Sequence, residues 1–229
     1  PNEKQKRILK RLGEKSLKVV TMAKNAQTLL HSIYDLPLHK IEMVHHGVPY
    51  RELHPSQELK KEFGYEEKEL ISTFGLLSPG KGIEYAIEAM VKVVDENPNA
   101  IYLILGRSHP DQAGETYRNK LESLAKELNL ENNVIFVNKF LSIDELIRYI
   151  QMSDIYLTPY LSKDQAVSGT LAYPIGVVFA IDSTPYLYAK EMLDENRGLL
   201  AEFESTDSLA KSLNYVLQNP KEKLKMEKN

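Results

Sequence analysis

The sequence predicts an α/β fold in which a doubly wound parallel sheet carries helices on both faces. Short runs such as 70–74 and 100–105 are mostly apolar and show no strict alternation of polar and apolar residues. Such runs are typical of strands that are buried on both faces of a parallel sheet. Longer segments with apolar residues at helical spacing separate these runs, so strand and helix alternate along the chain.

The expected elements follow one another closely along the chain. The strands are the short apolar runs 17–21, 41–44, 70–74, 100–105, 134–137, 154–158, 177–181 and 198–201. The helices are the segments with apolar residues at helical spacing, namely 23–34, one starting at Ser56, 83–95, 115–128, one starting at Ser142, 167–175, 188–193 and 206–217. Segment 49–55 begins and ends with proline and is expected to be a linker.

Local signals mark several helix ends. Ser142 is followed three residues later by Glu145, which is the pattern of a capping box. Ser56 is a candidate N-cap, because its hydroxyl could accept a hydrogen bond from the first helical turn. The tail from Pro220 is charged and is expected either to fray or to cap the fold.

Composition excludes several classes of protein. The 229 residues suffice for one large domain or a domain and part of another, and a net charge of −3 without a basic face argues against a nucleic-acid partner. The absence of cysteine excludes disulfides, thiolate metal sites and cysteine nucleophiles. No apolar run approaches the ~18 residues of a transmembrane helix, and no signal peptide is visible. We therefore expect a cytoplasmic protein whose native start lies upstream of Pro1.

The most informative segment for function is 74–82, Phe-Gly-Leu-Leu-Ser-Pro-Gly-Lys-Gly, which joins an expected strand to an expected helix. Glycine lets the backbone approach a phosphate closely, and the start of a helix offers unpaired N–H groups. Gly75 and Lys81 are therefore candidates for binding an anionic, nucleotide-linked ligand. Most Gly-rich turns before helices are only turns, so this segment alone does not decide the function.

Further candidates follow the other strands, because sheets of this kind bind ligands at the carboxyl ends of their strands. They are Gly106, Arg107 and His109 after one strand, and Asp164, Ser168, Gly169 and Thr170 after another. His109 could carry a proton, contact a sugar hydroxyl or be an ordinary loop residue. Ser168 could cap the following helix, or it could form an anion cradle with backbone N–H groups.

We expect no metal and no cofactor. His45, His46 and Gly47 follow a strand, but no acidic or further histidine partner stands at ligand spacing. The acidic residues form neither a DxD pair nor an HExxH motif.

The order of these segments resembles the C-terminal half of a GT-B glycosyltransferase of the retaining group 1 family, also called family 4. The match covers about residues 16–217. Its segments are 44–48, which resembles the interdomain HGV segment, 74–82, which resembles GRLxxxKG, 103–106, which resembles LxIxG, and then 143–149, 154–159, 168–173, Glu191 and 197–200 in the family's order.

The resemblance implies two Rossmann-like domains around a cleft. Residues 1–50 would end the N-terminal acceptor domain and form the interdomain segment, and residues 51–229 would bind the nucleotide sugar. The chain alone would then be an inactive part of a retaining hexosyltransferase, whose missing N-terminal domain binds a carbohydrate or lipid-linked acceptor. The family uses no bound metal, and Lys81 with the backbone of 168–170 would hold the diphosphate. No catalytic residue is assigned.

Two departures from the family pattern keep a second interpretation open. Leu76 stands where the family has an arginine, and Arg107 is a candidate replacement. The E-x7-E signature is also absent, because its first acid falls near Lys163 or Asp164 and its second near Leu171. The second acid of the family usually holds the ribose hydroxyls, so either Thr170 replaces it or ribose binding is weak. The alternative is a non-catalytic domain that binds a sugar nucleotide or a carbohydrate. A dinucleotide-binding domain is disfavoured, because no GxGxxG follows a strand.

Overall fold

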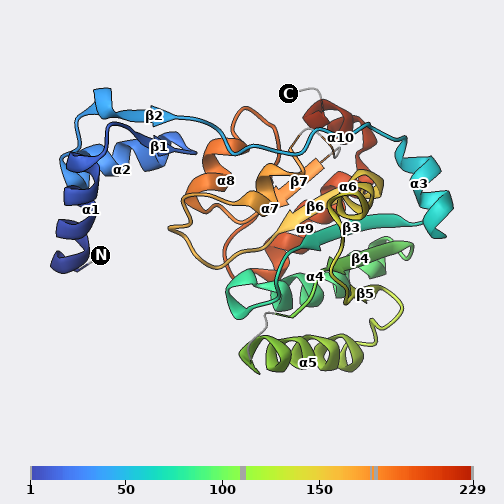
Figure 1. The fold of residues 1–229 in the computed structure, drawn as a ribbon. Coiled ribbons are helices and arrows are strands. Elements are labelled where there is room, and N and C mark those ends of the chain that lie inside the picture. The colour runs from blue at the N-terminus through green and yellow to red at the C-terminus, as the bar shows by residue number, and fades with distance from the viewer. Residues whose placement is uncertain (1, 109–111, 176, 178–179, 228–229) are drawn as a thin grey trace.

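A computed structural model describes residues 2–108, 112–175, 177 and 180–227. Its centre is a parallel sheet in the order β5-β4-β3-β6-β7-β8 (Figure 1). The strands are β3 (Glu69–Phe74), β4 (Ala100–Leu105), β5 (Val134–Val137), β6 (Ile155–Thr158), β7 (Ala180–Ser183) and β8 (Leu199–Leu200). The strand order reverses between β3 and β6, and sheets of this type bind ligands beside such a switch point. The predicted doubly wound parallel sheet is confirmed.

Helices cover both faces of this sheet and bury it. One face packs against α4 (Ile83–Glu96), α5 (Gln112–Glu127) and α9 (Thr206–Gln218). The other face packs against α3 (Ser56–Phe63), α6 (Ile143–Met152), α7 (Gly169–Ala172) and α8 (Leu187–Met192). Because both faces are covered, every residue of β4 is buried, which explains the mostly apolar character of the strand.

A smaller group of elements precedes the main sheet. It consists of α1 (Glu3–Lys15), β1 (Val19–Thr21), α2 (Lys24–Tyr34), a 3₁₀ helix at Leu38–Lys40 and β2 (Ile41–Met43), and β1 pairs with β2 in parallel. Figure 1 shows this group to one side of the main sheet. The sequence analysis predicted both strands and α2, but it did not predict α1.

Residues 44–55, which we call the connecting segment, link β2 to α3. Near its start, the Val44 N–H donates to the Thr21 carbonyl at 2.8 Å. Near its end, the Gln151 amide donates to the Glu52 carbonyl at 2.9 Å, and Arg51 pairs with Asp144 at 2.5 Å. The connecting segment is thus held at both ends.

The segment 167–175 differs most clearly from the sequence-based expectation. The helix predicted there is only the single turn α7. Pro174 has no N–H to donate to the carbonyl four residues earlier, so a regular helix cannot continue through it. The strand predicted at 177–181 instead runs from Ala180 to Ser183.

The capping predictions were partly right. Ser142 and Glu145 form the predicted capping box at the start of α6. The prediction for Ser56 was wrong, because Pro55 occupies the cap position and the Ser56 hydroxyl donates to the Met152 carbonyl at 3.1 Å. The charged tail does not fray at Pro220 but forms a further helix, α10 (Pro220–Glu227).

A buried ion cluster attaches α10 and α3 to the sheet. The Asp154 carboxylate receives the Lys60 and Lys223 ammonium groups, each at 2.5 Å, and the Leu70 N–H at 2.8 Å. Burial alone would raise the pKa of Asp154, but the two lysines outweigh it and lower that pKa. Asp154 therefore stays ionised in the interior, because positive charge surrounds it.

Candidate functional site

Two glycines bring the carboxyl ends of β3 and β4 together. Gly75 and Gly106 have φ angles of 134° and 131°, a conformation that side chains other than glycine's rarely allow. A Cβ on Gly106 would lie 2.4 Å from the Gly75 carbonyl oxygen. The backbone itself therefore requires glycine at both positions.

The Gly-rich loop is fastened to the segment that follows β6. The Leu161 N–H donates to the Gly80 carbonyl at 3.1 Å. A Cβ on Gly82, whose φ is 60°, would lie 2.1 Å from the Pro159 carbonyl oxygen. Close packing thus requires glycine at position 82, which the sequence did not reveal. The same contact brings Lys81 next to Tyr160.

Lys81 is a partly buried cation at this junction. Its Nζ lies 3.9 Å from the centre of the Tyr160 ring, which is a cation–π arrangement. Burial lowers the pKa of Lys81 to about 8. Within the described ranges no carboxylate forms an ion pair with Lys81, so the ammonium is placed to meet an external anion.

Hydroxyl groups continue from Tyr160 to the start of α7. The Tyr160 hydroxyl is hydrogen-bonded to Thr170 Oγ1, which lies 3.0 Å from Ser168 Oγ. Ser168 is buried, and its Oγ accepts the Leu171 N–H at 3.2 Å, so its capping role is confirmed. We call Lys81, Tyr160, Ser168 and Thr170 the polar cluster.

Gly75 and Gly169 border the polar cluster on two sides. A Cβ on Gly75 would lie 3.3 Å from the Thr170 methyl group. A Cβ on Gly169 would lie 3.1 Å from Nε2 of His46, which belongs to the connecting segment. The side of Gly169 that a side chain would occupy is therefore taken by an imidazole, and this gives the glycine a packing role.

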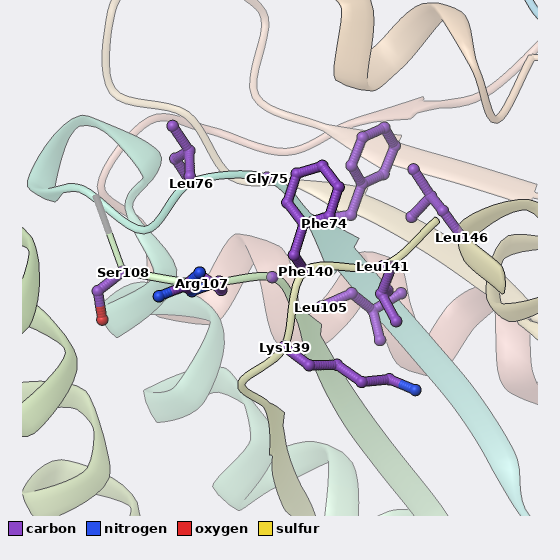
Figure 2. Close-up of a pocket in the computed structure, with 11 residues that line it drawn as sticks. Phe74, Gly75, Leu76, Leu105, Arg107, Ser108, Lys139, Phe140, Leu141 and Leu146 are labelled. Carbon is purple, nitrogen blue, oxygen red and sulfur yellow. The ribbon is translucent and has the colours of Figure 1, made fainter. Parts of the chain in front are cut away.

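An open pocket of about 410 Å³ adjoins the polar cluster at the ends of β3, β4 and β5. Its lining is mostly apolar and consists of Phe74, Gly75, Leu76, Leu105, Gly106, Phe140, Leu141 and Leu146, with Arg107, Ser108 and Lys139. Phe140 is 82% exposed, and Figure 2 shows its ring projecting toward Gly75. Gly75 belongs to the pocket lining and also borders the polar cluster, so one ligand could reach both.

Comparison with known proteins decides the family. The family model for glycosyl transferases group 1 matches residues 56–229. The chain belongs to this family. It is also 26% identical over 211 residues to an uncharacterized glycosyltransferase, MJ1607, of Methanocaldococcus jannaschii, and the match covers 89% of this chain.

Solved structures of other proteins share the fold. The Anabaena protein Alr3699/HepE, solved with UDP and glucose, matches with a TM-score of 0.78 and 16% identity over 100% of this chain. Sucrose-phosphate synthase from Thermosynechococcus elongatus matches with a TM-score of 0.80 and 17% identity over 99% of this chain. The chain spans 52% of the length of the M. jannaschii relative, and 61% and 55% of the two solved chains.

For this group 1 glycosyltransferase chain, the structure brings together most of the residues that the sequence singled out. Gly75, Gly106 and Arg107 line the pocket, and Lys81, Ser168, Gly169 and Thr170 form or border the polar cluster. Asp164 lies in an exposed turn, and His109 lies outside the described residues.

Sequence reasoning missed Tyr160, Phe140 and His46. Tyr160 and Phe140 stand in the loops that follow β6 and β5, where the other candidates were sought. An aromatic residue in such a loop is easily interpreted as part of the core. His46 was considered as a metal ligand and as part of the segment that resembles the interdomain HGV segment, but not as a residue of the donor site. In the part of the chain that the structure describes, no group of three or more His, Cys, Asp or Glu side chains could hold a metal ion, and no helix is long and apolar enough to cross a membrane.

Proposed function

We propose that the chain supplies the donor site of a retaining, family 4 hexosyltransferase, which transfers a sugar from a nucleoside-diphosphate sugar to an acceptor. The observation that carries this proposal is the junction, at Gly75, of an apolar pocket with a polar cluster that contains a desolvated lysine. An apolar pocket with few polar groups suits a nucleoside, and a buried cation suits the diphosphate next to it.

In this proposal the base and ribose lie in the pocket and the diphosphate lies at the polar cluster. The exposed ring of Phe140 offers a face on which a base can stack, and Arg107 and Lys139 are cations at the pocket wall. Lys81 and the Thr170 hydroxyl face the diphosphate, and Thr170 is close enough to Gly75 to contact the ribose end as well.

Transfer replaces the diphosphate at the anomeric carbon by an acceptor oxygen on the same face of the sugar. Negative charge develops on the departing diphosphate, and the Lys81 ammonium stabilises that charge without rearranging. The acceptor, a carbohydrate or lipid-linked hydroxyl compound, would bind to an N-terminal domain of which residues 1–50 form the end. This division, with residues 51–229 as the donor domain, agrees with a relative of which the match covers only 52%.

A second candidate function is non-catalytic binding of a sugar nucleotide or carbohydrate. One observation favours it: Leu76, which takes the place of the family's arginine, lines the pocket and is half exposed, and therefore offers no charge to the donor. Arg107 lies in the same pocket lining and is the cation that could replace it.

Calorimetric titration of the 229-residue chain tests the proposal. The ligands are UDP-glucose, GDP-mannose, ADP-glucose and NAD. We expect one of the sugar nucleotides to bind with a Kd below about 1 mM and NAD to bind at least tenfold more weakly, without sugar transfer by this chain alone. Absence of binding by all three sugar nucleotides would overturn the proposal.

The two candidate functions separate in a longer protein that includes the N-terminal half. An enzyme releases nucleoside diphosphate when a suitable acceptor is present, and NMR of the product would show the anomeric configuration of the donor. Binding without turnover for a broad acceptor panel would favour the non-catalytic function, and an inverted product would contradict the retaining mechanism.

A further inference from the structure

The side chain of His46, in the connecting segment, lies against Gly169, which borders the polar cluster. Its imidazole lies against Gly169, with Nε2 3.1 Å from the position of a Cβ there. Its ring also meets the edge of Tyr173, at 6.2 Å between ring centres. His46 is half buried, whereas His45 beside it is exposed. The hydrogen bonds of Val44 and Glu52 fix the connecting segment on either side of this contact.

The hydrogen bond of His46 determines which ring nitrogen can meet a ligand. Nδ1 lies 2.7 Å from the Gly47 carbonyl oxygen. A carbonyl only accepts, so Nδ1 carries a proton and Nε2 is the free position of the neutral ring. Nε2 is also the atom that faces Gly169, next to Thr170 of the polar cluster.

We infer that His46 is a ligand-binding residue of the donor site and that it binds the diphosphate as an imidazolium. This inference rests on the proposed function. A phosphate oxygen accepts hydrogen bonds, so Nε2 must gain a proton to donate one, while Nδ1 stays protonated through Gly47. Binding therefore takes up a proton, and the connecting segment contacts the ligand when the donor site is filled.

The charged groups around His46 do not favour this protonation before a ligand binds. Tyr173 packs against the ring, and from the Gly-rich loop the Lys81 ammonium lies beyond Tyr160 and Thr170. Within the described residues no carboxylate pairs with His46 in the free protein. The diphosphate is then the anion that favours the charged ring, because an opposite charge nearby stabilises the protonated imidazole.

Calorimetry at pH 7 in two buffers of different ionisation enthalpy tests the inference. The probe is the tightest of the three sugar nucleotides; free UDP is unsuitable, because a terminal phosphate itself titrates near pH ~6. The parent protein should take up protons on binding, seen as a difference in the observed enthalpy between the two buffers. Lys81 contributes little at this pH, because its pKa of about 8 leaves it mostly protonated already.

Three variants separate the role of His46 from general effects. His46→Gln should weaken binding about tenfold or more and abolish most of the proton uptake. His45→Gln is the matched control and should change the affinity less than twofold. Gly169→Ala places a methyl group against Nε2 and should act like His46→Gln, with little further loss when both changes are combined.

The outcomes distinguish this inference from the proposed function. If the parent binds a sugar nucleotide but His46→Gln binds equally well, or takes up the same number of protons, the inference is wrong and the proposed function stands. If the parent binds none of the three, both are wrong. An unchanged melting temperature in His46→Gln shows that lost affinity is not lost folding.

Discussion

The main sheet and the N-terminal group of elements share the same alternation of strand and helix, but their strand residues are buried to different extents. Every residue of β4 is buried, whereas β1 has one buried residue in three. Large apolar side chains stay exposed in the N-terminal group, among them Leu12, Leu17, Val20 and Ile33. A parallel pair of three-residue strands cannot cover its own faces.

The difference shows what holds each region in place. The main sheet is stabilised by a continuous apolar core, so it should fold by itself. The N-terminal group is attached to the main domain by Ala23, which is buried in an apolar cluster of that domain, and by a few polar contacts. The most direct are the N–H groups of Lys24 and Asn25, which donate to the Glu191 carboxylate at 2.6 and 3.0 Å. This fits our proposal that the group belongs to a larger acceptor domain.

The largest expected effect comes from the ion cluster of the main domain. Asp154→Ala leaves Lys60 buried without its counter-charge, and such a loss typically costs about 3–5 kcal/mol of folding stability. Urea unfolding at pH 7 measures it. The control is Asp207→Ala, which removes an exposed pair with Lys92 and should cost less than about 1 kcal/mol. Equal effects would mean that the buried cluster adds nothing.

Asp182 makes the stability of the main domain depend on pH. It is fully buried on β7, one of its oxygens has no partner among the described residues, and burial raises its pKa to about 7. The folded state therefore holds this proton more tightly than the unfolded state. The stability that the protonated Asp182 contributes is fully present below the pKa of about 4 that an aspartate has in the unfolded chain. It is lost as the pH rises to 7, and the loss in folding free energy is up to about 4 kcal/mol.

Asp182→Asn should remove this loss. We expect the variant to be more stable than the parent at pH 8 and to approach it, or fall below it, at pH 4.5. Urea unfolding at both pH values measures the difference. A parent and variant whose stabilities run parallel across this range would show that Asp182 titrates at its ordinary value.

The fold could be predicted from the sequence because buried parallel strands and amphipathic helices repeat a local pattern. The site could be predicted only where it follows strand ends, as Gly75, Lys81 and Thr170 do. The contact of His46 with Gly169 joins residues more than a hundred positions apart, and no local spacing encodes it. The short α7 was missed because the apolar spacing of 167–175 continues past Pro174.

Lys81→Ala should weaken the main domain's binding of the diphosphate more than its binding of the nucleoside. A charge-assisted hydrogen bond contributes roughly 1.5–3 kcal/mol, so affinity for UDP, or the matching diphosphate, should fall about ten- to a hundredfold. Affinity for the nucleoside should stay within about twofold. Equal losses for both ligands would show that Lys81 contacts no phosphate.

The smallest expected effect concerns the contact that attaches the N-terminal group to the main domain. Ala23 occupies the N-cap position of α2 without a side-chain cap of its own, and Glu191 of α8 replaces it. Losing a helix cap costs about 0.5–2 kcal/mol. Glu191→Ala should therefore speed amide exchange in α2 by about three- to thirtyfold, while β3 and β4 keep their protection, because the main sheet does not depend on this contact.

Two further variants show whether charge or position matters in this contact. Lys190→Ala changes an exposed neighbour on the same helix and should leave exchange in α2 unchanged. Glu191→Gln keeps one accepting oxygen but loses the negative charge near the positive end of α2, so it should fall between the parent and Glu191→Ala. If Glu191→Ala instead speeds exchange in β3 and β4 as much as in α2, the two regions unfold together, and the N-terminal group is then an integral part of the main domain.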